Sequence, residues 1–164
     1  MNKIYEESNY YFDFTNSLSG ECLDKPNVQG LSAVDFMVET DMYLLFIEIK
    51  NPDNPRATEA SRKNFFKDLQ GDVFPLAMGM KFKDSVLKKY ALAYKFEKPI
   101  KYIIVLQFDI FAEKERGILR EKILNHIPTG LRDEIFSKFT KIDSFEIMNI
   151  NEFSEKYFTA TKIS

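Results

Sequence analysis

The sequence predicts an α/β sandwich with a mixed central sheet flanked by helices, and three observations support this fold class. Two apolar runs, at residues 33–38 and 43–50, are close enough in the chain to form a β-hairpin. Helical patterns follow at residues 58–69 and 75–94. The β-branched run at residues 102–106 then predicts a strand that is buried on both faces. Strands separated by helices favour right-handed crossovers.

The first thirty residues carry weaker signals. The aromatic run at residues 10–14 predicts a short strand, and residues 21–23 predict a second one. Gly20, Pro26 and Gly30 interrupt the chain around these runs, because glycine and proline favour turns. We therefore expect no long helix before the hairpin.

The residues after the hairpin mark where the first two helices begin and end. The loop at residues 51–55 contains two prolines, which lack an amide hydrogen and stop the strand. Thr58 is the expected N-cap of the first helix, and Gly71 follows its end. Pro75 falls in the first turn of the second helix, whereas Gly79 weakens that helix.

The last third of the chain predicts further helices and one strand. An amphipathic helix is expected at residues 112–127, with the single histidine, His126, near its end. The remaining predicted elements are a helix at 131–139, a strand at 145–148 and a helix at 151–158 capped by Asn151.

Length and composition predict one domain, residues 1–164, in the cytoplasm. The lone Cys22 excludes an intramolecular disulfide and favours a reducing compartment. One cysteine and one histidine cannot form a Cys/His zinc site. No apolar run is long enough to cross a bilayer, and the first residues lack the apolar core of a signal peptide. The formal net charge of -2 gives no overall basic bias of the kind seen in nucleic-acid-binding proteins.

Three charged residues of the hairpin form the main candidate site. Burying Asp35, Glu48 and Lys50 in apolar strands is costly unless they pair with one another or bind a metal. A tight turn at residues 40–41 would place Asp35 opposite Phe46, with Glu48 as a diagonal neighbour on the same face. A longer loop would place Asp35 directly opposite Glu48. Lys50, two residues after Glu48, shares its face.

These residues have the chemistry of a magnesium or manganese site. Two carboxylates and one backbone carbonyl are oxygen ligands, which suit Mg²⁺ or Mn²⁺. We expect Asp35 and Glu48 as ligands, with the carbonyl of Ile49 as a third. Lys50 would orient or activate a water, or stabilise the charge that develops on a phosphate. Such a site would serve phosphodiester hydrolysis.

The same residues resemble a known group of nucleases. Asp35, twelve intervening residues and then Glu48-Ile49-Lys50 are similar to the motif of the PD-(D/E)xK nuclease superfamily, which includes many restriction endonucleases. Val34 stands where the motif name would put proline. The resemblance covers about residues 10–106. It implies a restriction-endonuclease-like fold and magnesium-dependent cleavage of DNA or RNA, with Asp35, Glu48 and Lys50 as the catalytic residues.

Two further positions that the superfamily often uses are not fixed by the sequence. Many members carry an additional acid on an N-terminal helix, for which the candidates here are Glu6, Glu7 and Asp13. Many also carry a glutamine or a basic residue on the helix after the hairpin, for which the candidates are Gln70, Lys63 and Lys67.

Three functions therefore stay open. The first is a nuclease that acts as a homodimer or with a protein partner, because no separate DNA-reading module is visible. The second is a nuclease-like scaffold that binds protein or nucleic acid without cutting. The third is an unrelated α/β interaction module, in which Asp35, Glu48 and Lys50 form a salt-bridged cluster. For Asp35 itself, the structural alternative is a buried acid paired only with Lys50. Four lysines of the second helix either form its solvated face or line a nucleic-acid groove: Lys81, Lys83, Lys88 and Lys89.

Overall fold

The computed structural model describes residues 3–107, 113–127 and 142–163. The strands are β1 (Ile4–Glu7), β2 (Tyr10–Asp13), β3 (Ser19–Cys22), β4 (Phe36–Glu39), β5 (Leu44–Lys50), β6 (Ile100–Leu106), β7 (Ile142–Met148) and β8 (Ala160–Lys162). The helices are α1 (Glu59–Gln70), α2 (Val73–Ala91), α3 (Glu113–Leu124) and α5 (Ile150–Lys156). None of the described helices is long and apolar enough to span a membrane.

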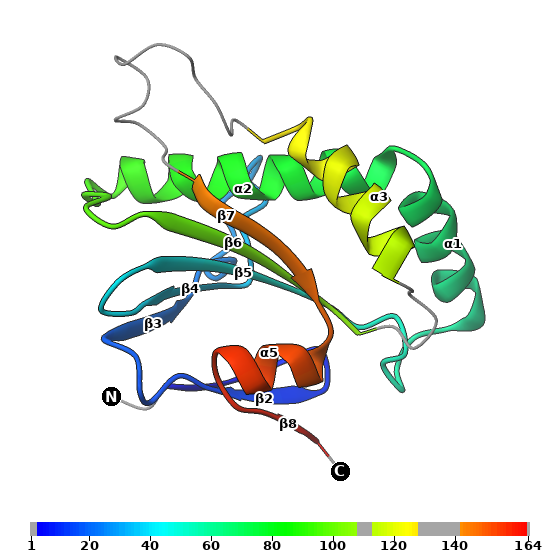
Figure 1. Cartoon of the computed structure of the whole chain (residues 1–164), viewed down its shortest axis with the longest axis horizontal. Coiled ribbons are helices and arrows are strands. Elements are labelled where there is room, and N and C mark those ends of the chain that lie inside the picture. The colour runs from blue at the N-terminus through cyan, green and yellow to red at the C-terminus, as the bar shows by residue number, and fades with distance from the viewer. Residues whose placement is uncertain (1–2, 108–112, 128–141, 164) are drawn as a thin grey trace.

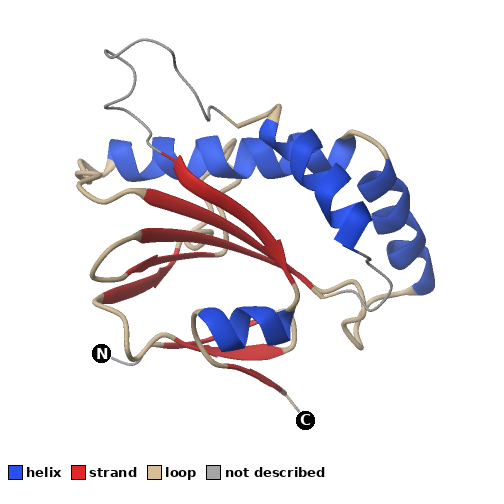
Figure 2. Ribbon diagram, in the orientation of Figure 1, coloured by secondary structure: helices blue, strands red, loops and turns tan. Residues whose placement is uncertain are grey.

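A five-stranded mixed sheet forms the centre of the molecule, in the order β3-β4-β5-β6-β7 (Figure 1). Its first three strands pair antiparallel, whereas β5, β6 and β7 are parallel. Helices α1, α2 and α3 cover one face of this sheet (Figure 2). The other face is covered by a three-stranded sheet, β1-β2-β8, together with α5. The predicted α/β class with a mixed central sheet is confirmed.

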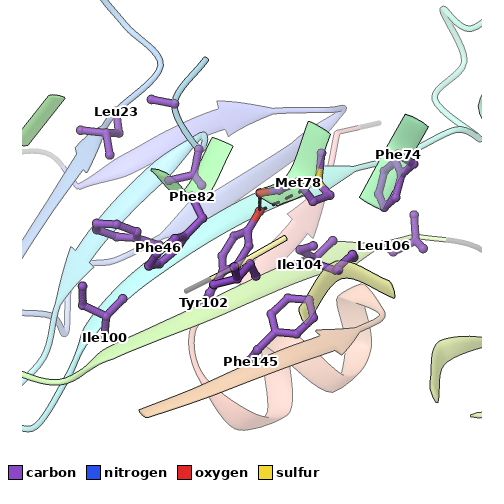
Figure 3. Close-up of a cluster of buried hydrophobic side chains, with 14 of the residues drawn as sticks. Leu23, Phe46, Phe74, Met78, Phe82, Ile100, Tyr102, Ile104, Leu106 and Phe145 are labelled. Carbon is purple, nitrogen blue, oxygen red and sulfur yellow. Dashed lines mark hydrogen bonds between the residues drawn. The ribbon is translucent and has the colours of Figure 1, made fainter. Parts of the chain in front are cut away.

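The core between the central sheet and the long helices is rich in aromatic residues (Figure 3). The ring of Phe82 from α2 packs against Phe46 of β5 and Tyr102 of β6, with ring centroids 5.7 and 5.4 Å apart. Tyr102 is fully buried, and its hydroxyl donates a hydrogen bond to the Met78 carbonyl at 3.0 Å. This bond offsets the cost of burying the hydroxyl group of Tyr102, and it links α2 to the sheet.

A second core lies on the opposite face of the central sheet. Phe12 of β2, Phe36 of β4 and Phe153 of α5 meet there, with Phe12 5.5 Å from Phe36 and 5.9 Å from Phe153 between ring centroids. Alternation along each central strand supplies both cores, since successive side chains point to opposite faces. The small sheet and α5 are thus needed to cover the apolar residues on this face of the central strands. Two strands of the small sheet, β1 and β8, were not predicted from the sequence.

The register of the hairpin differs from the tight-turn expectation. Val38 pairs with Leu45, not with Tyr43, because the loop from Thr40 to Tyr43 is four residues long. Thr40 closes this loop: its amide donates to the Tyr43 carbonyl, and its hydroxyl oxygen accepts from the Tyr43 amide at 3.0 Å. Continuing the register beyond Phe36 and Ile47 by one residue brings Asp35 level with Glu48, which is the longer-loop alternative.

Several element boundaries also depart from expectation. The first hairpin strand begins at Phe36, so residues 33–35 precede it rather than belong to it. The N-cap of α5 is Asn149, not Asn151, because the Asn149 side chain and Glu152 form a reciprocal capping box. Thr58 does cap α1, as predicted. The helix predicted at residues 131–139 lies outside the described residues.

A close approach between α2 and the end of α3 generates a test of this packing. A Cβ atom on Gly79 would lie 2.4 Å from the His126 Cβ and 2.9 Å from its carbonyl oxygen. We therefore expect Gly79→Ala to destabilise the protein by about 1–3 kcal/mol, although alanine favours helix. Denaturant unfolding followed by circular dichroism measures this. The control is Gly117→Ala on α3, where nothing lies within 4 Å; it should stabilise by roughly 0.5–1 kcal/mol. Equal stabilisation by both changes would contradict the packing.

Candidate active site

A cleft of about 270 Å³ opens at the carboxyl end of β5, beside α1 and the end of β1. Three of the four predicted site residues line it: Asp35, Ile49 and Lys50. Glu7, Asn51 and Arg62 also contribute to its wall. The cleft therefore combines carboxylate, amide and cationic groups that come from distant parts of the chain.

Asp35 is held at the base of this cleft by the backbone of β5. Its side chain is almost fully buried, and its Oδ2 accepts a hydrogen bond from the Ile49 amide at 2.7 Å. The N–H and C=O of one strand residue point to the same side of the strand. The carbonyl of Ile49 is therefore directed toward the side on which Asp35 lies. Lys50 points its own carbonyl the other way, where it accepts from the Gln107 amide at 2.8 Å.

Glu48 is completely buried and lies between two lysines. Its Oε1 is 2.5 Å from the Lys50 Nζ and 2.8 Å from the Lys81 Nζ. Its Oε2 accepts a hydrogen bond from the Lys81 Nζ at 2.9 Å. Lys50 therefore pairs with Glu48, and the alternative in which Asp35 pairs only with Lys50 is wrong.

Lys81, which was expected only on a solvated face or in a nucleic-acid groove, belongs to the charged cluster of the site. Besides Glu48, its Nζ approaches Asp35 to 4.0 Å and donates to the Ala33 carbonyl at 3.1 Å. Its carbonyl accepts from the Ser85 hydroxyl, which in turn accepts from the Val34 amide at 2.8 Å. α2 thus fixes the segment that carries Asp35. The available signal was spacing: Lys81 lies on the buried face of α2, three residues after Met78.

Two of the other lysines of α2 contradict both predictions made for this set, whereas Lys83 is exposed, as the solvated-face alternative predicts. Lys88 is buried and donates to the carbonyls of Leu23 and Pro26, at 2.6 and 2.9 Å. Lys89 is buried and pairs with Glu21 at 2.7 Å. Because these ammonium groups bind the protein itself, they form neither a solvated face nor a nucleic-acid groove.

One of the candidate N-terminal acids reaches the cleft. Three carboxylate oxygens, one each from Glu7, Asp24 and Asp35, lie within 4.8 Å of one another. Glu7 was a candidate, whereas Asp24 had no signal in the sequence because it lies in an irregular loop. Among the described residues neither Glu7 nor Asp24 forms an ion pair. A divalent cation with oxygen ligands fits such a set.

The other candidates lie outside the cleft. Glu6 is exposed, and Asp13 accepts the Thr15 amide at the end of β2. The candidates on α1 are exposed and do not line the cleft: Gln70, Lys63 and Lys67. Arg62 takes their place, with its Nε donating to the Pro52 carbonyl at 3.2 Å. No local motif distinguishes Arg62 from the other basic residues of α1.

The cleft contains a buried oxygen atom without a hydrogen bond, Asn51 Oδ1. Among the described residues, the buried side-chain polar atoms without a hydrogen bond are Glu48 Oε1, Asn51 Oδ1 and Ser144 Oγ. Glu48 Oε1 touches both ammonium groups at ion-pair distance but without hydrogen-bond angles. Asn51 lines the cleft, and its Nδ2 donates to the Ser8 carbonyl at 2.9 Å. Glu48 Oε1 is thus already compensated by two cations, whereas Asn51 Oδ1 is free to accept from a polar ligand or to bind an ion.

The pKa values of Asp35 and Lys50 are both raised, with opposite consequences for their charges. Burial, followed by repulsion from Glu48, raises the pKa of Asp35 from 3.8 to about 7. Burial lowers the pKa of Lys50, but attraction to Glu48 and Asp35 outweighs it, so the net shift is upward. Lys50 is therefore an ammonium ion at neutral pH, while Asp35 can exchange its proton near pH 7.

Comparisons of the chain with protein-family models, with curated proteins and with solved structures find no match. The residues of the cleft are therefore the basis on which a function can be assigned. They include a nearly buried acid, a second acid, and two cations at one opening.

The raised pKa of Asp35 predicts how stability depends on pH. The folded chain holds this proton more tightly than the unfolded chain, so its contribution is complete below pH 4 and is lost as the pH rises through 7. Relative to Asp35→Asn, the metal-free wild type should lose about 4 kcal/mol of unfolding free energy between pH 4 and 8.5. Urea unfolding at each pH measures the difference. The control is Asp41→Asn, at an exposed position, for which the difference in unfolding free energy from the wild type should stay the same at every pH. A difference between wild type and Asp35→Asn that does not change with pH would contradict the buried environment of Asp35.

Proposed function

We propose that this chain is a metal-dependent nuclease with a restriction-endonuclease-like fold, which hydrolyses phosphodiester bonds of nucleic acid with Mg²⁺ or Mn²⁺. The observation that carries the proposal is the cleft: Asp35, Ile49 and Lys50 line one water-accessible opening, joined there by Glu7. Glu48, Ile49 and Lys50 end β5, and Asp35 directly precedes β4, which is similar to the arrangement of the motif that the sequence resembles.

The oxygen atoms at the cleft fit a hard divalent cation. Asp35, Glu7 and the Ile49 carbonyl would hold it, with Asp24 close enough to join them. Glu48, the other predicted ligand, does not line the cleft, and its Oε1 contacts the ammonium groups of Lys50 and Lys81. It would join the ion only by giving up one of these contacts. Such an ion polarises a phosphoryl oxygen and lowers the pKa of a bound water.

The cations of the cleft have separate roles in this proposal. Lys50 remains protonated, so it stabilises negative charge on the phosphate rather than accepting a proton from water. Arg62 presents a guanidinium group, whose planar fork suits a phosphate. Lys81 does not line this cleft. It neutralises Glu48 from the α2 side of the sheet and keeps Lys50 and Asp35 in place.

A second function has one specific observation in its favour. Glu48 is sealed from solvent and is neutralised by two ammonium groups, which is what a structural ion cluster requires. A scaffold with this cluster would bind nucleic acid or protein at the cleft without cutting. Binding without cleavage under all divalent-ion conditions would select this alternative.

Cleavage assays test the main proposal. Purified chain with Mg²⁺ or Mn²⁺ should cut at least one of plasmid DNA, single-stranded DNA and RNA, and chelation should stop it. Asp35→Asn and Lys50→Ala should each lower the rate by about 10²-fold or more, because each removes a charge that acts on the phosphate or the ion. Lys63→Ala is the matched control, since Lys63 is exposed, does not line the cleft and pairs with Glu59 of its own helix. Equal rates for Lys50→Ala and wild type would refute the assigned role.

Binding of the ion can be measured without any substrate. Calorimetric titration with Mn²⁺ should show a site that Asp35→Asn and Glu7→Gln weaken by about tenfold or more. Because the ion must displace the Asp35 proton, the affinity should rise between pH 6 and 8. Asp41→Asn, in the distant hairpin loop, should leave the titration unchanged. Absence of any Mn²⁺ heat at pH 8 would leave only the non-cleaving alternative.

A further inference from the structure

The outer face of α2 carries an exposed apolar stripe. The exposed side chains on it include Val73, Leu76, Met80, Leu87 and Tyr90, of which Val73 and Tyr90 are 61% and 59% accessible. At 3.6 residues per turn this stripe lies about half a turn round the axis from the buried side of the helix. Figure 1 shows α2 along the outer edge of the molecule, with the central sheet on its inner side. α2 is thus apolar on two opposite faces, where a surface helix usually has one.

The spacing of the stripe is that of a helix-pairing seam. With Lys83 included, its members follow one another at intervals of 3, 4, 3, 4 and 3 residues. Alternating intervals of three and four residues form the heptad repeat, at which two helices keep the same faces together. A single lysine within such a seam is a usual device for setting register. The interval pattern reads the same from either end, so the stripe is complementary to itself when two copies run antiparallel.

A hollow accompanies the C-terminal half of the stripe. A pocket of about 610 Å³ lies against α2 and the chain that follows it. Its wall contains Leu87 and Tyr90 of the stripe, with Tyr94 and Phe96 beyond the helix. The N-terminal half, in contrast, presents Val73 and Leu76 outward. Projecting side chains at one end and a hollow at the other are the two halves of an isologous contact.

We propose that the chain forms a homodimer in which the α2 helices of two copies pack antiparallel along this stripe. In this arrangement Val73 lies against the partner's Tyr90, and Leu76 lies against the partner's Leu87 at the hollow. Met80 lies against the partner's Lys83 near the two-fold axis. The 19 residues of α2 give about 28 Å of contact along the helix.

Charge at the centre of the contact also favours a second copy as the occupant. Lys83 is exposed in the seam, and the neighbouring Asp84 is held by a hydrogen bond from the Ser32 amide at 2.9 Å. Two-fold symmetry brings each Lys83 toward the other copy's Asp84, so two opposite pairs form around the axis. Such pairs fix the alignment of the helices more than they add affinity.

Sedimentation equilibrium tests the association from about 1 µM to about 1 mM, the range in which a small interface dimerises. The mean mass should rise toward twice the monomer value. Leu87→Glu and Leu76→Gln should each weaken dimerisation by about tenfold or more, whereas Lys83→Leu should strengthen it. Met42→Glu is the control, because Met42 is an apolar residue of the distant hairpin loop that is more exposed than Leu76 or Leu87. Thermal melts verify that each variant folds.

Disulfide trapping tests the antiparallel alignment. In a Cys22→Ser background, a mixture of Val73→Cys and Tyr90→Cys chains should form a mixed disulfide dimer. Val73→Cys chains alone should not, since their sulfurs would lie at opposite ends of the helix pair, about 25 Å apart. Crosslinking of Val73→Cys to itself would overturn the alignment. A mass that stays monomeric to about 1 mM, or a dimer unaffected by Leu87→Glu, Leu76→Gln and Lys83→Leu, would overturn the interface. None of these results depends on nuclease activity.

Discussion

A carboxylate sealed between a sheet and a helix governs the arrangement of this molecule. Glu48 has no contact with solvent, and burial of its charge is tolerated because Lys50 and Lys81 both touch it. Lys81 reaches it from α2, so a shift of this helix along the sheet would leave the buried Glu48 carboxylate without one of its two cations. The same lysine holds the Ala33 carbonyl, and thereby positions the chain that leads to Asp35. One ion cluster therefore fixes the helix, the strand end and the opening of the cleft together.

The cleft keeps its charges in unequal states. The ammonium of Lys50 is stabilised by the acids around it, while Asp35 is destabilised as an anion by burial and by Glu48. An arrangement of this kind costs folding stability at neutral pH, because the fold would be more stable without the ionised acid. Natural chains tolerate such costs mainly where a ligand or a reaction depends on the group. The buried Asn51 Oδ1, which lines the cleft and accepts no hydrogen bond, follows the same logic.

The sequence was a good guide where local chemistry decides the structure. Strand periodicity predicted β5 and β6, and the convergence of Asp35 with Glu48 followed from alternation once the loop length was known. Thr58 was recognised as a cap because its contact spans only three residues. Contacts between distant segments had no such signal. Lys81 meets Glu48 only because α2 folds back over β5, and Asp24 approaches Asp35 only because Lys88 pins an irregular loop.

The small sheet is built from opposite ends of the described chain. β2 lies between β1 and β8, and a hydrogen bond joins the Asn9 side chain to the Ile163 carbonyl across 154 positions. Pairing over such a separation carries a large loop-closure entropy, so it is repaid only after the intervening chain is ordered. We therefore expect the β5-α1-α2-β6 unit to fold early. The aromatic core around Phe12, between the two sheets, should form last. Until then, the apolar underside of the central sheet is open to solvent, which makes that interval the time of greatest aggregation risk.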